Sequence, residues 1–175
     1  MARHVRAFAV TVLVLAALAV LAGLLWSALS PRAPYQVTGH GTVLADPATQ
    51  ALIAADGWFA VVTGGLGVLC GAAGWFLSRH DRLPVLLGLC AGGALAAFVT
   101  LWVGSTFTLG AVTVEAAATP GAKVVAGSLQ LTARGVLVAW PLCAVAIFGL
   151  MEGMHGYRDS PLRTPYGVGD PPGLG

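Results

Sequence analysis

Charged residues are scarce in this sequence of 175 residues, because Asp, Glu, Lys and Arg together make up only 9% of it. A soluble domain carries roughly a quarter, and so few charges cannot cover a water-soluble surface. Hydrophobic residues make up 57%, and the net charge is only +2. The basic residues are scattered, so the sequence lacks the basic stripe that neutralises nucleic-acid phosphates. The composition indicates a lipid bilayer as the surroundings and no nucleic-acid partner.

Cysteine is also scarce, and all three cysteines lie in apolar blocks: Cys70, Cys90 and Cys143. This placement argues against a disulfide framework and favours thiols as small apolar fillers. Cys70 and Cys90 fall at similar predicted depth, so a metal or redox pair is the alternative, but two thiols lack the ligand set of a structural zinc site. The sequence contains no nucleophile elbow, zinc-protease helix or phosphate loop. We therefore expect no enzyme, and no catalytic, cofactor-binding or metal-binding residues.

Long apolar blocks are abundant, and they carry the prediction of fold class. A helix needs about 20 apolar residues to cross a bilayer core of about 30 Å. Four blocks come close to this length, and they contain no Asp, Glu, Lys, Arg or His. The sequence predicts an all-α membrane protein with a bundle of four transmembrane helices. The predicted spans are residues 7–29, 58–77, 83–104 and 135–151.

The arginines and lysine between the spans predict the orientation, since short cytoplasmic loops are enriched in both. With the N-terminus inside, six of the nine basic residues lie on the cytoplasmic side. The predicted cytoplasmic segments are residues 1–6, the turn 78–82 and a Pro- and Gly-rich tail, 152–175, which we expect to be disordered. The predicted outer loops are residues 30–57 and 105–134.

The first apolar block has a second interpretation, as a cleaved signal peptide, because Arg3 and Arg6 precede it. Its apolar stretch is longer than the usual 7–15 residues of a signal peptide core. The small residues near Ala28 to Ser30 also match a cleavage site poorly. We favour retention of this block as a membrane anchor.

Both outer loops contain alternating patterns that are typical of strands. The first pattern covers Tyr35 to Leu44, and the second extends beyond a turn at Pro120-Gly121 to Val124-Val125. An isolated hairpin is marginal in water, so we expect the two loops to pair into a small extracytoplasmic β-sheet. Asp46-Pro47 is typical of a helix start, which predicts helix from Ala48.

Glycines predict where the helices pack, because small residues let helices approach closely in a bilayer. The second span carries Gly67 and Gly71 four residues apart, and the third carries Gly88 and Gly92. Counted from the turn at His80, the two pairs lie at matching depth. We expect these notches to face each other across a hairpin, although 24 glycines also produce such spacings by chance. Pro141 predicts a kink in the fourth span near Leu137.

Three outer residues are candidates for contact with a partner: His40, Asp56 and Trp58. His40 lies between two glycines, which favours a turn residue over a ligand. Asp56 precedes the predicted second span, where a helix cap is the alternative to a binding carboxylate. Trp26, Trp58, Trp75 and Trp102 lie near predicted span ends, as expected for rings at the headgroup level.

The order of these features resembles a family of small actinobacterial four-span membrane proteins of unknown function. The similarity rests on Leu-Leu-Trp-Ser-Ala-Leu-Ser-Pro at 24–31, a Gly-rich outer strand, and Ala-Asp-Gly-Trp-Phe at 55–59 before a glycine-rich span. The resemblance implies four spans in the plasma membrane of a Gram-positive bacterium and no particular chemistry.

The functional hypothesis follows from uncharged spans, because transporters and proton pumps place ionisable groups at membrane depth. We expect a non-enzymatic accessory or scaffold subunit of the plasma membrane. Its partners would be the lipid bilayer and another membrane protein, or a second copy of this chain. The alternative is a small transporter or lipid-flippase component that acts as a homo-oligomer, and an enzyme of the outer face ranks third.

Overall fold

Four long helices dominate this computed structural model, which describes residues 2–38, 41–46, 48–78, 82–107, 124–127 and 129–158. Each helix is long and apolar enough to cross a membrane, as the four apolar blocks predict. The helices are α1 (Ala2–Leu29), α2 (Ala51–Leu77), α3 (Arg82–Thr106) and α4 (Ala139–Arg158), and a 3-10 helix, η2 (Arg134–Val138), precedes α4. Only helices and closed barrels satisfy all backbone hydrogen bonds in lipid, so uncharged blocks of this length favour this structure.

The helices are longer than the predicted spans. At about 1.5 Å per residue the 28 residues of α1 extend over about 42 Å, which exceeds the roughly 30 Å of the hydrocarbon core. Because α1 begins at Ala2, nearly all of the predicted N-terminal segment 1–6 is helical. Residues 152–158, expected to begin a disordered tail, belong to α4; residues 159–175 lie outside the described part of the chain.

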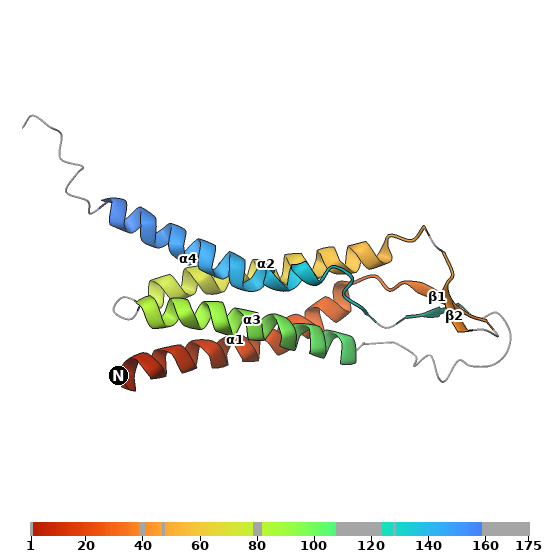
Figure 1. The fold of residues 1–175 in the computed structure, drawn as a ribbon, viewed down its shortest axis with the longest axis horizontal. Coiled ribbons are helices and arrows are strands. Elements are labelled where there is room, and N and C mark those ends of the chain that lie inside the picture. Colours follow the sequence, from red (N-terminus) through yellow and green to blue (C-terminus); the bar gives the residue numbers. More distant parts are fainter. Residues whose placement is uncertain are drawn as a thin grey trace, which may run out of the picture.

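The helices form two closely packed pairs, α1 with α3 and α2 with α4, as Figure 1 shows. Contacts between α1 and α2 and between α2 and α3 are sparse by comparison. The central core still contains side chains from all four helices, among them Leu15, Val62, Leu89 and Phe148. The end of the bundle where α1 and α3 begin and α2 and α4 end (Figure 1) contains Arg3, Arg6, Arg82 and Arg158, and we call it the arginine end. We call the opposite end the sheet end.

The four predicted packing glycines all lie at close helix contacts, but the predicted contact partners were wrong. A Cβ atom on Gly67 would lie 2.6 Å from the Trp140 carbonyl oxygen, and one on Gly71 would meet the backbone of α4 at Ala144. A Cβ on Gly88 would lie 2.9 Å from the Cβ of Thr11 in α1. Gly92 likewise lies against α1, at Val12 and Leu15. A small helix face specifies close approach but not which helix approaches, and here the chain neighbours α2 and α3 face other partners.

A three-stranded antiparallel sheet lies beyond the sheet end of the helices (Figure 1). Its strands are β1 (Pro34–Thr38), β2 (Gly41–Leu44) and β3 (Val124–Ala126), in the order β2-β1-β3. Tyr35 is aligned with Leu44 on one side and with Val125 on the other. Strands from both segments, 30–57 and 105–134, are thus adjacent in one sheet. Residues 108–123, where further strand patterns occur in the sequence, lie outside the described residues.

The start of α2 differs from the prediction. Asp46 Oδ1 accepts a hydrogen bond from the Ala48 backbone N–H at 2.9 Å, which closes a turn. The helix begins only at Ala51, after Gln50, whose side chain makes no capping bond. The Thr49 N–H also donates to the Asp46 carbonyl, so Asp46 shapes the connection from the sheet and does not cap α2.

Pro141 lies in the first turn of α4, since the α-helix begins at Ala139. The expected disturbance near Leu137 takes the form of a change of helix type, from 3-10 in η2 to α in α4. A proline in the first turn of an α-helix removes a donor that has no helical acceptor. The 3-10 turn thus accommodates the proline without breaking an α-helix in its interior.

Candidate functional site

A cleft of about 980 Å³ separates α1 from α2 and has α3 along its base. It exists because α1 packs on α3 and α2 packs on α4, which leaves the side between α1 and α2 loosely closed. Its volume is at the upper end of typical ligand sites, which range over about 300–1,000 Å³. We call it the α1–α2 cleft. Its apolar walls include Val10, Val14, Leu18, Leu66, Leu69, Ala73, Val85 and Leu89.

The polar rim of the α1–α2 cleft lies at the arginine end. Arg3 and Arg6 in the first turns of α1 and Ser78 at the C-cap of α2 all line the cleft. The Ser78 backbone N–H donates to the Gly74 carbonyl at 3.0 Å, which holds the residue in the last turn. Ser78 is only 5% exposed, and its hydroxyl has no hydrogen-bond partner among the described residues. A buried hydroxyl without a partner is costly, which marks this rim as a place where a ligand atom would be stabilised.

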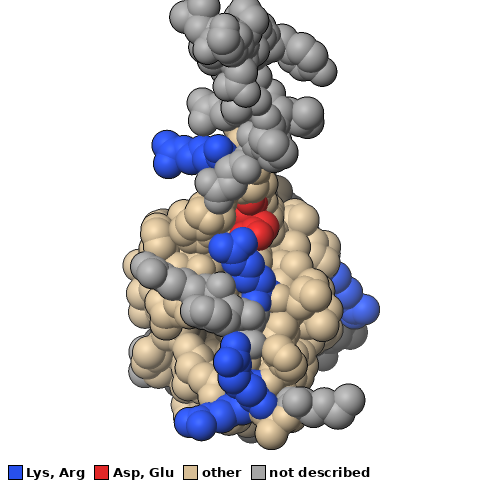
Figure 2. Space-filling model, turned by 90° about the vertical axis from the view of Figure 1, so that its left-hand side faces the viewer, with Lys and Arg blue, Asp and Glu red and all other residues tan. Residues whose placement is uncertain are grey.

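Arginines outnumber acidic residues at the arginine end among the described residues, and Figure 2 shows this end with basic side chains on its surface. Arginine guanidinium groups are suited to phosphate and carboxylate because their planar fork donates several hydrogen bonds. The arginines of this end that the structure describes are Arg3, Arg6, Arg82 and Arg158, and the described acidic residue here is Glu152.

Glu152 links three helices at the arginine end. Its carboxylate in α4 pairs with Arg82 at the start of α3 and accepts a hydrogen bond of 3.0 Å from Trp75 Nε1 in α2. The Trp75 ring also packs edge-on against the His155 ring, with 5.8 Å between centroids. Both charged side chains of the pair are more than a third exposed, so this junction is electrostatically weak.

Asp56 forms the corresponding junction at the sheet end. Its carboxylate is buried at 8% exposure, and its two oxygens accept hydrogen bonds from the backbone N–H groups of Thr132 at 2.9 Å and Ala133 at 2.8 Å. These groups immediately precede η2, where a helix start leaves N–H groups without helical acceptors and favours negative charge. The expectation that Asp56 caps the entry of the second helix was wrong, because α2 begins at Ala51 and Asp56 lies in its second turn; its carboxylate caps η2 instead.

Aromatic packing reinforces the sheet end. Trp26 is fully buried, donates from Nε1 to the Ala55 carbonyl at 2.9 Å and packs edge-on against Phe59 with 5.1 Å between centroids. Leu129 completes this second core cluster from the segment before η2. The prediction that Trp26 lies at the lipid headgroups was therefore wrong, because the ring is buried within the protein and its N–H donates within the chain. Trp102, by contrast, is 66% exposed.

Two of the three candidate partner residues, Asp56 and Trp58, lie near each other in the second turn of α2. Asp56 uses both carboxylate oxygens within the chain, Trp58 is 41% exposed beside it, and His40 lies outside the described residues. The role of His40 and Trp58 in partner contact stays a prediction. The α1–α2 cleft was missed, because its rim joins residues 3 and 6 to residue 78, and no local pattern indicates that pairing. The sequence feature that could have indicated the rim of the cleft is the pair of arginines, Arg3 and Arg6, in the first turns of α1.

The exposed face of α4 contains glycines with open space around them. A Cβ atom on Gly149, Gly153 or Gly156 would meet no described atom within 4 Å outside its own helix turn. In the most apolar stretch of each helix, the share of buried residues is 17% for the helix at Arg134–Arg158, 22% for α1 and 44% for α3. The face is therefore accessible to lipid or to another helix.

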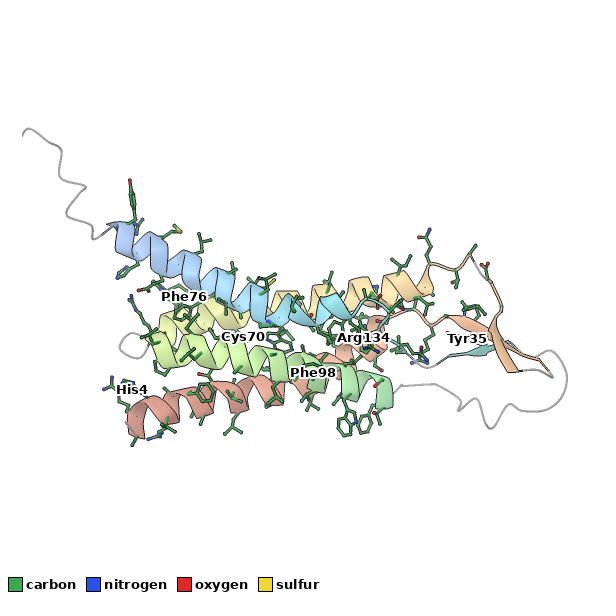
Figure 3. All side chains as sticks on the ribbon, in the orientation of Figure 1. His4, Tyr35, Cys70, Phe76, Phe98 and Arg134 are labelled. Carbon is green, nitrogen blue, oxygen red and sulfur yellow. The ribbon has the colours of Figure 1, made fainter. Side chains whose placement is uncertain are left out.

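The cysteines do not form a pair. Cys70, labelled in Figure 3, is half-buried and lines the α1–α2 cleft, whereas Cys90 is exposed on α3 and Cys143 lies in α4 beside Gly64. All three are free. Within the described ranges no three His, Cys, Asp or Glu side chains cluster as a metal site would require. Figure 3 also shows His4 and Tyr35 at opposite ends of the molecule.

Comparison with known proteins gives no relative for this chain. No family model matches it, and neither a curated protein nor a solved structure is significantly similar.

Proposed function

We propose that this chain is a non-enzymatic accessory or scaffold subunit in the plasma membrane, crossing the bilayer four times with both ends in the cytoplasm. The arginine end would be cytoplasmic and the sheet extracytoplasmic. Support comes from the excess of arginine at one end, as cytoplasmic segments have. The packing of α1 into the core, through Leu15, Ala19 and Ala22, supports retention of the first span. The resemblance to small actinobacterial four-span proteins supports a Gram-positive plasma membrane.

The observation that carries the accessory role is the use of the acidic groups. Among the described residues the acidic side chains are Asp46, Asp56 and Glu152, and each accepts a hydrogen bond within the chain. Two of them link separate helices. Groups committed in this way stabilise a fold and are poorly placed for acid–base chemistry, which favours a protein that acts by contact.

The surface proposed for the partner is the exposed face of α4, and the occupant is a transmembrane helix of another membrane protein. Glycine in a helix interior costs about 1 kcal/mol relative to alanine and gains nothing against lipid. It does permit close approach of a second helix. Gly149 and Gly153 are both exposed, so the face is accessible to such a helix.

The test combines mild-detergent purification with substitutions on α4. The tagged chain should retain a stoichiometric foreign membrane protein identified by mass spectrometry, and Gly149→Leu with Gly153→Leu should abolish that retention. Gly65→Leu is the matched control, since Gly65 also has open space around it but lies on α2. Retention that survives both α4 substitutions would contradict the proposed surface, and a pure self-oligomer would contradict the accessory role.

The second candidate is a small transporter or lipid-flippase component that acts as a homo-oligomer. The α1–α2 cleft favours it, because an apolar cleft with a basic rim can hold a lipid-like substrate without ionisable groups at mid-depth. A pure self-oligomer in the purification would support this candidate.

Orientation has a separate test. His40→Cys and Lys123→Cys should react with a membrane-impermeant maleimide on whole cells, whereas His155→Cys at the arginine end should react only after lysis. The unsubstituted chain measures the background from its own cysteines, all of which lie in helices. The reverse pattern would invert the proposed orientation.

A further inference from the structure

The α1–α2 cleft joins a long apolar wall to a basic rim, and these two parts correspond to the two parts of a phospholipid. We propose that the cleft binds one anionic phospholipid, with its phosphate at Arg3, Arg6 and Ser78 and an acyl chain along the wall. This inference rests on the membrane-spanning arrangement in the proposed function, and it is independent of the accessory role and of the α4 surface.

The length of the apolar wall fits one acyl chain in one leaflet. From Arg6 to Leu18 along α1 the rise is about 18 Å at about 1.5 Å per residue. Half of the hydrocarbon core is about 15 Å thick. The facing wall on α2 extends from Leu77 to Leu66. A chain that enters at the rim would therefore lie against apolar side chains over the full depth of its leaflet.

The rim offers hydrogen-bond donors at one place from two helices. Arg3 and Arg6 lie one turn apart on α1, so both guanidinium groups can reach the same anion. Ser78 faces them from the end of α2, and its buried hydroxyl lacks a partner among the described residues. A phosphate oxygen would accept from that hydroxyl and from a guanidinium N–H. These bonds are charge-assisted, which makes them about twice as strong as neutral ones.

The charge of the rim selects an anionic headgroup. The described lining of the cleft contains two arginines and no acidic side chain, so the ammonium group of a zwitterionic lipid would find no carboxylate there. Glu152, the described acidic residue of this end, is paired with Arg82. A phosphatidylglycerol headgroup, with one negative charge and hydroxyl groups, matches the rim better than phosphatidylcholine.

Native mass spectrometry of the detergent-purified full chain tests the proposal. Dioleoyl phosphatidylglycerol and dioleoyl phosphatidylcholine are titrated separately, and we expect a preference for phosphatidylglycerol. The double variant Arg3→Gln/Arg6→Gln should bind phosphatidylglycerol about tenfold or more weakly, as expected for loss of charge-assisted bonds. Ser78→Ala should weaken binding by a smaller factor. Arg158→Gln is the matched control, because this arginine is at the same end but does not line the cleft.

A steric variant and a chemical probe locate the lipid within the cleft. Ala73→Trp narrows the apolar wall and should reduce binding of either lipid, whereas Ala146→Trp on the exposed face of α4 should not. In a Cys90→Ser/Cys143→Ser background, Cys70 should react more slowly with N-ethylmaleimide when phosphatidylglycerol is present. This second readout remains valid if the arginine variants do not fold.

Three outcomes would overturn the proposal: equal affinity for the two lipids, binding that is unchanged in the arginine and Ala73→Trp variants, or Cys70 reactivity that phosphatidylglycerol does not alter. A second copy of the chain in the cleft would appear as a dimer that Ala73→Trp abolishes, and this too would contradict it. Extraction of membranes with alkaline carbonate distinguishes failure of the spanning arrangement from failure of the lipid site. Release of the chain would refute the spanning arrangement itself, whereas retention without lipid selectivity would refute only the lipid site.

Discussion

The two ends of the bundle are held together by different kinds of interaction. At the sheet end, buried groups make specific bonds: Asp56 caps η2, and Trp26 donates to the Ala55 carbonyl while packing on Phe59. At the arginine end, the main polar link is the half-exposed pair of Glu152 and Arg82. The α1–α2 cleft has its polar rim at this second end.

This difference indicates a division of roles along the bundle. A buried carboxylate with two backbone donors and a buried indole each lose much when their partners are removed. An exposed ion pair contributes little. We therefore expect the sheet end to contribute more to the stability of the fold than the arginine end. Substitutions at the two ends should differ in cost accordingly.

The largest effect is expected from Trp26→Ala. Loss of a fully buried tryptophan costs about 3–5 kcal/mol, since it removes the packing on Phe59 and the indole hydrogen bond to the Ala55 carbonyl. The free energy of unfolding can be measured by reversible titration with sodium dodecyl sulfate in mixed micelles. Trp75→Ala at the arginine end is the comparison, and it should cost clearly less because that ring is only half-buried. Equal costs would remove the proposed difference between the ends.

Asp56→Ala should destabilise the chain by about 1–3 kcal/mol, because two backbone N–H groups lose their acceptor. Asp56→Asn keeps one acceptor oxygen, so its free energy of unfolding should lie between those of the unsubstituted chain and Asp56→Ala. The same titration measures both, and hydrogen exchange at Thr132 and Ala133 should accelerate in each variant. Unchanged exchange would show that Asp56 does not cap η2.

Gly67→Ala tests the close contact between α2 and α4 in the middle of the bundle. The added Cβ would lie 2.6 Å from the Trp140 carbonyl oxygen, so a helix must shift, at a cost of about 1–2 kcal/mol for overpacking. Gly65→Ala is the control on the open side of the same helix, and it should stabilise by up to about 1 kcal/mol through helix propensity. If both substitutions stabilised the fold, the close contact of α2 with α4 would be wrong.

The smallest effect is expected from Glu152→Gln. Glutamine retains an acceptor for Trp75 Nε1 but removes the charge that pairs with Arg82, and exposed pairs are worth about 0.2–1 kcal/mol. The change should shrink further at high salt, because solvent ions screen exposed charges. A loss comparable to that of Asp56→Ala would contradict the view that the arginine end is loosely held.

The helices and their approximate limits could be predicted from the sequence, but the contacts between them could not. Gly67 and Gly71 mark a small face on α2, and such a face is compatible with any neighbouring helix of suitable depth. The structure pairs it with α4, across a separation of about seventy residues, as it pairs Gly88 and Gly92 with α1. Asp56 shows the same limit: its position suggested a cap, but its partners at 132 and 133 are distant in the chain.

Local composition by itself determined that this chain forms four long apolar helices, because length, apolarity and the lack of charge are properties of each segment alone. Tertiary structure alone decided that α1 packs on α3 and α2 on α4, and hence that a cleft separates α1 from α2 and brings Arg3 and Arg6 to Ser78. The physical reason is that helix formation in lipid is enforced by backbone hydrogen bonding within each segment. Helix pairing depends on the fit of surfaces from distant segments, and several pairings of small faces are sterically permitted.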